Sequence, residues 1–227
     1  MSFDTRGSAP GNLDLPSVPR RQNLREQVAY ALRAALIAGE MRPGVVYSAP
    51  TLATQFGVSP TPVREAMLDL AKEGLVEAVR NKGFRVVELS DRDLDEINQI
   101  RELIEIPTIA GLAGAISAEA AERLREIAQG IVDAAERGEI LDYIDADRRF
   151  HLELLGLAGN THLVEVVREL RDRARLYGVA ELAERGELTP SAREHVELLD
   201  LIVAGRAADA TDLMRRHLGH VRADWAH

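Results

Sequence analysis

The chain has 227 residues, 46% of them hydrophobic and 29% charged, and a formal net charge of −9, values that are ordinary for a globular protein of one or two domains. It has no cysteine, which excludes disulfides, thiolate nucleophiles and cysteine-based zinc sites and permits a reducing compartment. No run reaches the roughly 18 apolar residues that a membrane helix needs, so we expect a cytoplasmic protein without a membrane partner.

The charge is distributed unevenly along the chain. Residues 20–90 hold 10 Lys and Arg against 7 Asp and Glu, a net of +3, whereas residues 91–227 hold 17 Arg against 28 Asp and Glu, a net of −11. The first 19 residues hold the remaining −1. Such an asymmetry indicates that the N-terminal half contacts a polyanion.

The first 20 residues are rich in Gly, Pro and Ser and lack the apolar core of a signal peptide. We expect this segment, residues 1–20, to be a disordered arm. After it, Leu24, Val28, Leu32 and Leu36 recur at helical spacing. Gly39 ends the helix that these residues predict.

Two shorter helices are expected next, over residues 51–56 and 61–73. The tight turn Gly57-Val58 separates them. Ser59 is the predicted N-cap of the second helix, and prolines fall in its first turn, where a missing N–H costs little. Two helices of this size and spacing are typical of a helix-turn-helix.

A hairpin is predicted after the second helix. The β-branched runs over residues 75–79 and 84–87 flank Arg80-Asn81-Lys82-Gly83, which is a turn signal between two strands. Residues 21–88 are therefore predicted to form a winged helix-turn-helix domain, which is helical with a small β-hairpin as its wing.

The remainder of the chain, residues 91–227, has helical periodicity and no strand-like alternation. Ser90, Ser117 and Thr161 are predicted N-caps. We predict an all-α six-helix bundle here, so the fold class is mainly α. The six helices are expected over residues 91–115, 118–136, 139–156, 161–183, 190–204 and 207–225.

The first turn of the second motif helix would enter the major groove of DNA. Arg64 can bond a guanine edge through two hydrogen bonds, and Ser59 and Thr61 suit phosphate contacts. At the wing tip, Lys82 supplies charge and Gly83 permits a close approach of the backbone. Spacing alone leaves open the alternative that an ordinary helical domain contains one helix-turn-helix by chance.

The stretch GVSPTPVREAMLDLAKEGLVEAVRNKGFRVVEL closely resembles the winged-helix domain of the GntR family of bacterial regulators. The resemblance covers about residues 21–88 and implies binding of double-stranded operator DNA. Many members carry arginine after the serine, where this chain has Pro60, and Ala49-Pro50 replaces the commoner polar residues before the first motif helix. These two departures put the operator sequence in doubt, and not the binding of DNA.

Four residues of the predicted bundle are candidate metal ligands. Asp147 and His151 lie four apart on one predicted helix, so both side chains face the same way. His195 and His217 fall on the last two helices. Three imidazoles and a carboxylate would suit a divalent cation such as Zn, Ni, Cu, Mn or Fe. From spacing alone, the alternative that the distant histidines do not converge remains open.

Residues 91–222 resemble the FCD ligand-binding domain of FadR-like members of the GntR family. Many such domains hold a metal with an aspartate and three histidines, which implies Asp147, His151, His195 and His217 as the ligands here. The resemblance rests on Arg101 to Glu105, Asp147-Arg148-Arg149-Phe150-His151, Gly159-Asn160, Glu194-His195 and Met214-Arg215-Arg216-His217-Leu218.

Related domains bind small organic acids beside the metal, which implies a small carboxylate as effector. Arg101 is the predicted charged clamp, Arg173 is a second candidate, and Asn160 is expected to line the pocket. Surface ion pairs for the two arginines and a helix-breaking Gly-Asn turn for Asn160 are the alternatives. The remaining histidines are expected at the surface, namely His162, His220 and His227.

Three functions are compatible with these patterns. The first is a ligand-responsive regulator, commonly a repressor among its relatives, that binds a palindromic operator as a homodimer. The second is a metallohydrolase, but no recognisable acid–base motif accompanies the ligands, and the winged helix would have no purpose. The third is an architectural DNA-binding protein whose bundle only dimerises, and the four-ligand pattern argues against it. We therefore predict a regulator and not an enzyme.

Overall fold

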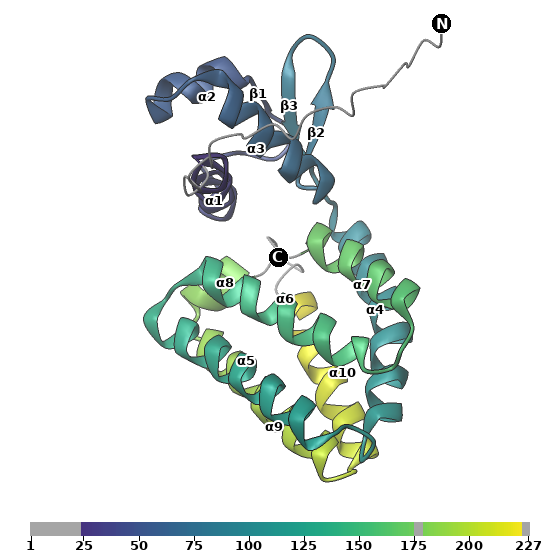
Figure 1. The fold of residues 1–227 in the computed structure, drawn as a ribbon. Helices are drawn as coiled ribbons and strands as arrows, with labels where there is room; N and C mark the ends of the chain where they lie inside the picture. Colours follow the sequence, from purple (N-terminus) through teal and green to yellow (C-terminus); the bar gives the residue numbers. More distant parts are fainter. Residues whose placement is uncertain (1–23, 175–178, 224–227) are drawn as a thin grey trace, which may run out of the picture.

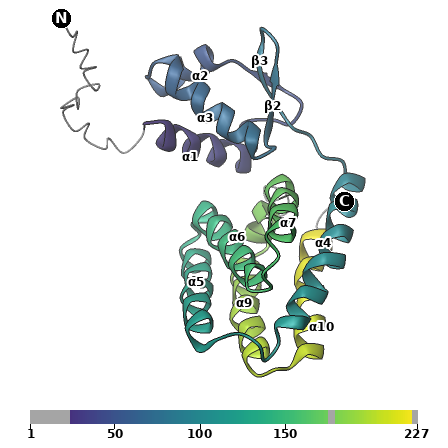
Figure 2. The ribbon, with the colours of Figure 1, turned by 45° about the vertical axis from the view of Figure 1, so that its right-hand side comes forward.

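The structure is a computed structural model that describes residues 24–174 and 179–223. A small N-terminal domain with a sheet stands on one end of a larger all-helical bundle (Figures 1 and 2). The predicted fold class, mainly α with an N-terminal winged helix-turn-helix and a C-terminal helical bundle, is confirmed. The expected arm over residues 1–20 lies outside the described residues.

The N-terminal domain contains three helices, α1 (Leu24–Ile37), α2 (Ala49–Phe56) and α3 (Pro60–Lys72). Helix α2 begins two residues before the predicted start, because the Ser48 side chain accepts a hydrogen bond from the backbone N–H of Thr51 and caps the helix. Gly57 then turns the chain in the left-handed region at φ 66°. Ser59 occupies the N-cap position of α3, but its side chain makes no cap hydrogen bond.

The three helices enclose one core. Ala53, Val63 and Leu70 are 2%, 0% and 0% exposed, and Val58 packs against the same core from its edge. Burial of these side chains holds α2 and α3 at a fixed angle, so the exposed face of α3 points away from the domain. The largest fully buried side chains of this core are Leu32, Met67 and Leu70.

A three-stranded antiparallel sheet follows, with β2 (Val76–Val79) and β3 (Gly83–Val86) as the predicted hairpin. The sheet order is β1-β3-β2. The third strand, β1 (Val46–Tyr47), pairs with Phe84 and Arg85 of β3. It was not predicted, since two residues are too few for an alternating pattern.

The bundle contains α4 (Asp91–Leu112), α5 (Ala118–Arg137), α6 (Ile140–Gly156), α7 (Thr161–Ala174), α8 (Val179–Glu184), α9 (Leu188–Val203) and α10 (Ala207–Ala223). Ser90 and Ser117 cap α4 and α5 as predicted, and Ser90 forms a capping box with Asp93. The helix predicted over residues 161–183 is described as two helices, α7 and α8, with 175–178 outside the described residues. The two have different neighbours, because α7 packs against α4 and α6, and α8 packs against α6 and α9.

Helix α5 lies between α6 and α9, and α10 lies between α4 and α9. Ile37 at the end of α1 packs against the bundle core and so links the two domains. No helix within the described part of the chain is long and apolar enough to cross a membrane. The bundle interior also holds buried polar side chains, which include Arg101, Glu105, His151, Arg171, His195 and His217.

Candidate functional site

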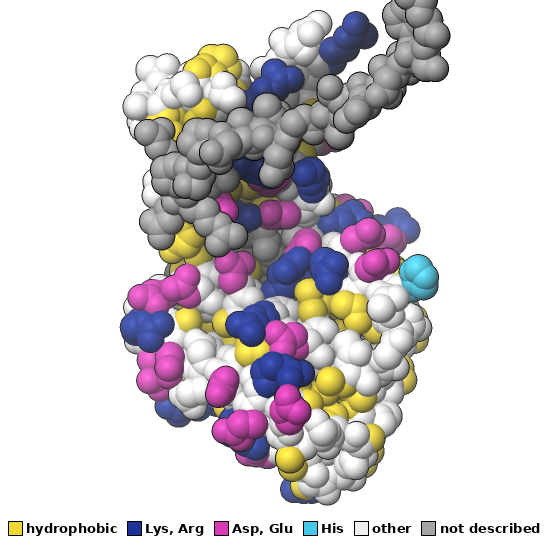
Figure 3. Space-filling model, viewed as in Figure 1, with side chains coloured by type: hydrophobic (Ala, Val, Ile, Leu, Met, Phe, Trp, Pro, Cys, Tyr) yellow, Lys and Arg dark blue, Asp and Glu magenta, His cyan; other side chains and the backbone are white. Residues whose placement is uncertain are grey.

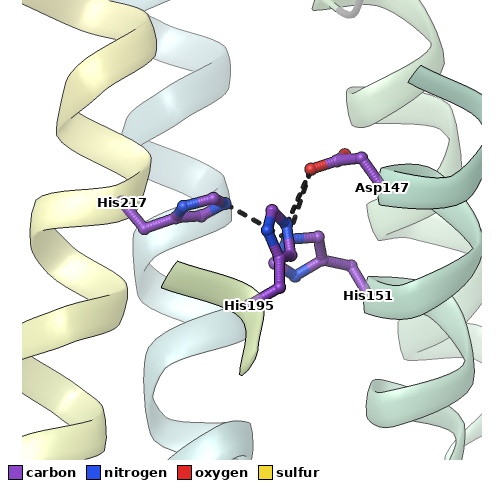
Figure 4. A group of neighbouring side chains, drawn as sticks. All are labelled: Asp147, His151, His195 and His217. Carbon is purple, nitrogen blue, oxygen red and sulfur yellow. Dashed lines mark hydrogen bonds and ion pairs between the residues drawn. The ribbon is translucent and has the colours of Figure 1, made fainter. Parts of the chain in front are cut away.

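Three histidines and an aspartate meet inside the bundle. Asp147 and His151 come from α6, His195 from α9 and His217 from α10, and the four side chains point toward one centre (Figure 4). His151 is 0% exposed, His195 1% and His217 9%. Each side chain offers one ligand atom, and these atoms all lie within 4.8 Å of one another. The structure therefore brings together the four residues that were predicted as metal ligands.

The converging atoms are Nε2 of each histidine and Oδ1 of Asp147. Nε2 of His151 lies 3.1 Å from Nε2 of His195 and 3.3 Å from Nε2 of His217. Oδ1 of Asp147 lies 2.9 Å from Nε2 of His195 and 3.7 Å from Nε2 of His151. Two nitrogens bound tetrahedrally to one zinc ion at about 2.0–2.1 Å lie about 3.4 Å apart. The separations fall on both sides of this value, so one cation fits between the four atoms.

The outer ring nitrogens fix the tautomers of two histidines. Nδ1 of His195 lies 3.1 Å from the carbonyl oxygen of Ala192, and Nδ1 of His217 lies 2.9 Å from Oε2 of Glu194. Both oxygens accept hydrogen bonds, so each Nδ1 carries a proton and donates it. Nε2 of the neutral ring then presents a lone pair toward the centre. Lone pairs that face one another and the Asp147 carboxylate repel, and a single metal ion would satisfy all of them.

The rings are also held by packing. Phe150 contacts His151 and His195 edge-on, with ring centroids 5.4 and 5.2 Å apart. Nδ1 of His151 is buried and has no hydrogen-bond partner among the described residues. Oε2 of Glu105 lies 3.9 Å from this nitrogen.

A buried network of ion pairs joins the aspartate to two arginines. Arg171 on α7 donates Nη1 to Oδ2 of Asp147 at 3.2 Å and Nη2 to Oε2 of Glu105 at 2.6 Å. Arg101 on α4 donates Nε to Oε1 of Glu105 at 2.8 Å. Glu105 is 0% exposed and each arginine 6%. The network fixes Asp147 through Oδ2, while its Oδ1 faces the histidines.

Arg101 was predicted as a site residue, whereas no role was predicted for Arg171, Glu105 or Glu194. The sequence does contain a signal for Arg171 and Glu105, because each occupies a position at which the helical periodicity predicts an apolar residue. Arg171 continues the stripe of Val164, Val167 and Ala174 along α7. A charged residue within an apolar stripe indicates a buried partner, although the stripe does not say which one.

Burial and neighbouring charges shift the pKa of several of these groups. Burial would raise the pKa of Asp147, but the hydrogen bond that a protonated His195 ring donates and the charge of Arg171 outweigh burial and hold this pKa well below its ordinary value. Burial, together with the charge of Arg171, holds the pKa of His151 well below its ordinary value. Burial also lowers the pKa of His217, against the hydrogen bond with Glu194. A deprotonated carboxylate and neutral imidazoles are the forms that bind metals.

A cavity of about 60 Å³ lies beside this group. Arg101, Arg148 and Arg171 line it together with Asp147 and His217, and apolar side chains from α6, α7, α8 and α10 complete its wall. Tyr143 and Ser191 add a buried pair of hydroxyls, with the oxygens 3.3 Å apart. The cavity is thus lined by three paired arginines and by apolar side chains.

The structure places two of the predicted effector residues elsewhere. Asn160 caps α7, because its Oδ1 accepts a hydrogen bond from the N–H of Leu163 at 3.1 Å. Arg173 contacts the N-terminal domain, where its Cγ would lie 3.2 Å from a Cβ added to Gly74. Neither residue lines the cavity beside the histidines.

The histidines outside the predicted set take no part in the site. His162 is exposed over 92% of its side chain and lies 3.5 Å from Glu165. The side chains of His220 and His227 lie outside the described residues.

The predicted DNA-binding residues lie on the exposed side of the winged helix-turn-helix. Ser59, Thr61 and Arg64 are exposed on the first turns of α3, and Lys82 is exposed in the β2–β3 turn. Figure 3 shows Lys and Arg side chains at the end of the molecule that carries this hairpin. Arg80, for which no DNA contact was predicted, is a second exposed cation in this turn.

Gly83 has an intramolecular role that was not predicted. It is the first residue of β3 and pairs with Val79 of β2. A Cβ at this position, where φ is +136°, would lie 2.3 Å from the carbonyl oxygen of Tyr47. The absence of a side chain therefore lets β1 approach β3, and the tip of the turn consists of Arg80, Asn81 and Lys82.

Comparison with known proteins identifies both domains. Residues 24–86 match the model of bacterial regulatory proteins of the gntR family, and residues 96–220 match the FCD domain. The HTH-type transcriptional regulator McbR of Escherichia coli K12 is 30% identical over 201 residues, which are 88% of this chain and 89% of that protein. The gluconate operon transcriptional repressor of Bacillus subtilis is 38% identical over 71 residues, which are 31% of this chain and 29% of that protein.

Solved structures agree with this result. The structure of Escherichia coli McbR/YncC has a TM-score of 0.67 and 28% identity, and covers 88% of this chain and 95% of its own. A putative GntR regulator from Rhodococcus sp. RHA1 has a TM-score of 0.67 and 26% identity, and covers 89% and 98%. These relatives are DNA-binding regulators and not hydrolases. The chain belongs to the GntR family of bacterial transcriptional regulators and consists of a winged helix-turn-helix followed by an FCD domain.

Proposed function

We propose that this protein is a ligand-responsive repressor whose bundle binds one divalent metal ion and, beside it, a small organic acid. One observation carries the proposal. Three imidazole Nε2 atoms and one carboxylate oxygen converge in the buried core, next to a cavity lined by three arginines.

Asp147, His151, His195 and His217 would hold the ion. This donor set suits Zn²⁺, Ni²⁺ or Mn²⁺. A bound divalent ion supplies positive charge and an open coordination position for a carboxylate. Arg101 would add a charged clamp for the same ligand, and we propose Arg171 in place of Arg173 and Asn160, because it lines the cavity.

Operator DNA would be read by the exposed face of α3 and by the wing. In this proposal Arg64 bonds a base edge or a phosphate in the major groove. Ser59 suits a phosphate contact, since its hydroxyl is free of a cap hydrogen bond. Thr61, Lys82 and the backbone at Gly83 would add contacts to the DNA backbone. Action on operator DNA implies a cytoplasmic location.

A homodimer would match a palindromic operator, because a two-fold protein fits a two-fold site. The outer face of α4 supports this part of the proposal. Ile100 is 43% exposed and Leu103 71%, and the exposed Pro107 and Gly111 continue the same stripe. An exposed apolar stripe of this kind is typical of an interface, and a second copy placed on it would pair two DNA-binding domains.

Repression is proposed from the relatives, since the gluconate operon protein carries that role in its name. The bundle would then respond to the organic acid by changing the position or mobility of the DNA-binding domains.

Thermal unfolding of the full chain against a panel of small carboxylates, with and without a chelator, tests the proposal. A ligand at 100 times its Kd stabilises the folded state by about 2.7 kcal/mol, which raises the Tm of a chain of this size by a few degrees. We expect a rise that the chelator abolishes. Protein that carries metal and shows no shift with any acid would contradict the effector part of the proposal.

A further inference from the structure

We propose that the effector is a dianion, a short dicarboxylate, and that its second carboxylate binds the arginine side of the cavity. The inference rests on the metal site proposed above. It follows from the charges of the side chains that surround the cavity, counted together with their partners.

Without a metal, the charged side chains of the cavity and their partners sum to zero. Arg101 and Arg171 share Glu105, and Arg171 also contacts Asp147. Arg148 binds Asp172 through two hydrogen bonds of 2.6 and 3.1 Å. Three arginines are therefore balanced by three carboxylates, those of Glu105, Asp147 and Asp172.

Other charges near the histidines are also compensated. Glu194, which accepts from His217, lies 3.1 Å from Arg216. Histidines that bind a metal through Nε2 and keep the proton on Nδ1 are neutral. A bound divalent ion would thus add two positive charges that no described side chain of the cavity balances.

Charge enclosed in this way is costly unless an opposite charge accompanies it. Arg101 and Glu105 are 6% and 0% exposed, so solvent screens this side of the cavity weakly. A monocarboxylate would leave one positive charge unbalanced, whereas a dicarboxylate would balance both.

The arginines also retain donors for a second carboxylate. Nε of Arg171 is buried and has no hydrogen-bond partner among the described residues. Arg101 uses Nε toward Glu105, and in the described part of the chain no further hydrogen bond occupies its two terminal nitrogens. A buried donor without an acceptor is unfavourable, and a guanidinium edge binds a carboxylate through two parallel bonds.

The size of the cavity limits the length of the acid. The free volume of about 60 Å³ is about four to six times the ~10–15 Å³ that one water molecule needs by the same measure. An acid with one to three carbons between its carboxylates is therefore favoured over a longer one, with its methylene groups against the apolar wall.

Isothermal titration calorimetry on the full-length, zinc-loaded protein tests the inference with matched acids. Malonate and succinate are compared with malonamate and succinamate, in which an amide of the same size replaces one carboxylate. We expect at least one dianion to bind tenfold or more tightly than its monoamide. Affinities within threefold for both pairs, or tighter binding of the monoamides, would overturn the inference.

Variants locate the second carboxylate. In Arg101→Gln the preference for the dianion should fall at least fivefold, while the zinc content stays at one per chain. Arg101→Lys keeps the charge and guards against loss of folding, and it should retain part of the preference. The control is Arg149→Gln, which alters an arginine of α6 that is 63% exposed and paired with Glu153, and it should behave as wild type. An unchanged preference in both Arg101 variants would overturn the assignment.

The proposed function and this inference fail in different ways. A chain that binds no zinc contradicts the metal site and the inference together. A chain with one zinc that binds neither the dianions nor the monoamides overturns the dianion inference and leaves the metal site standing.

Discussion

Nδ1 of His217 donates a hydrogen bond to Oε2 of Glu194 at 2.9 Å. This contact turns Nε2 of the ring toward Asp147, His151 and His195, and it raises the basicity of the ring as a ligand. Carboxylates that orient metal-binding histidines from outside are a recurrent feature of metal sites. Glu194 also contacts Arg216 on the surface side, so the orientation of His217 depends on an ion pair outside the bundle core.

Replacement of this carboxylate should weaken metal binding and preserve the fold. For Glu194→Gln we expect the zinc affinity to fall by about 10-fold to 100-fold, measured by competition with a chelator of known affinity. The matched control is Glu197→Gln, one turn further along α9, where the side chain is 59% exposed and lies 3.9 Å from Arg216. Equal zinc affinities of the two variants would contradict the role of Glu194.

Glu105 should matter for stability far more than an equivalent surface residue. The substitution Glu105→Gln leaves two buried arginines without their shared carboxylate, and breaking a buried ion pair costs about 3–5 kcal/mol. Arg92 and Glu96 lie on the same helix with the same spacing and the same 2.8 Å contact, but their side chains are 86% and 57% exposed.

Glu96→Gln should therefore cost only about 0.3–0.5 kcal/mol. Urea unfolding of the two variants measures the difference. Free energies of unfolding that agree within 1 kcal/mol would show that the buried network does not stabilise the bundle as described.

The wing should be sensitive to a single methyl group. In Gly83→Ala the added Cβ meets the carbonyl oxygen of Tyr47 at 2.3 Å, so the strands must move, and we expect a loss of about 1–3 kcal/mol of stability. A Cβ added to Gly130, within α5, would meet open space. Gly130→Ala should therefore stabilise the protein by up to about 1 kcal/mol. Thermal unfolding gives both values, and a stabilising Gly83→Ala would be inconsistent with the described packing of β1.

DNA binding should depend on α3 and the wing in different ways. With an operator selected from random duplexes, Arg64→Ala should lose about 1–3 kcal/mol of affinity and relax the preference at one base pair. Lys82→Ala should weaken all sequences alike and reduce the slope of log affinity against log salt by about 1. Arg168→Ala, an exposed arginine of α7 in the bundle, is the charge-matched control. Wild-type affinity of Arg64→Ala would remove this residue from the interface.

The elements of the fold follow from local patterns. N-caps at Ser90 and Ser117, the Gly57 turn and the β2–β3 hairpin were each predicted from short-range signals. Strand β1 was missed, because only its pairing with β3 makes Val46 and Tyr47 a strand.

The site was predictable only in part, because its contacts join helices that are distant in the sequence. The resemblance implied that the four candidate ligands converge, but the ion pair of Arg171 and Glu105 spans 66 positions. Arg173 was predicted to bind the effector, whereas Arg171 is the arginine of α7 that lines the cavity. Side chains two positions apart on a helix point in directions that differ by about 200°, so Arg171 and Arg173 face opposite ways. The sequence did not tell which of the two faces the interior.

The central claim is that Asp147, His151, His195 and His217 bind one divalent metal ion. The most direct test is the metal content of the purified chain after loading with zinc and dialysis, compared among wild type, His195→Ala and His162→Ala. We predict one zinc per chain in wild type and in His162→Ala, which changes a histidine with a 92% exposed side chain, and much less than one in His195→Ala. A wild-type chain without zinc, or a His195→Ala chain that retains one tightly bound zinc, would contradict the claim.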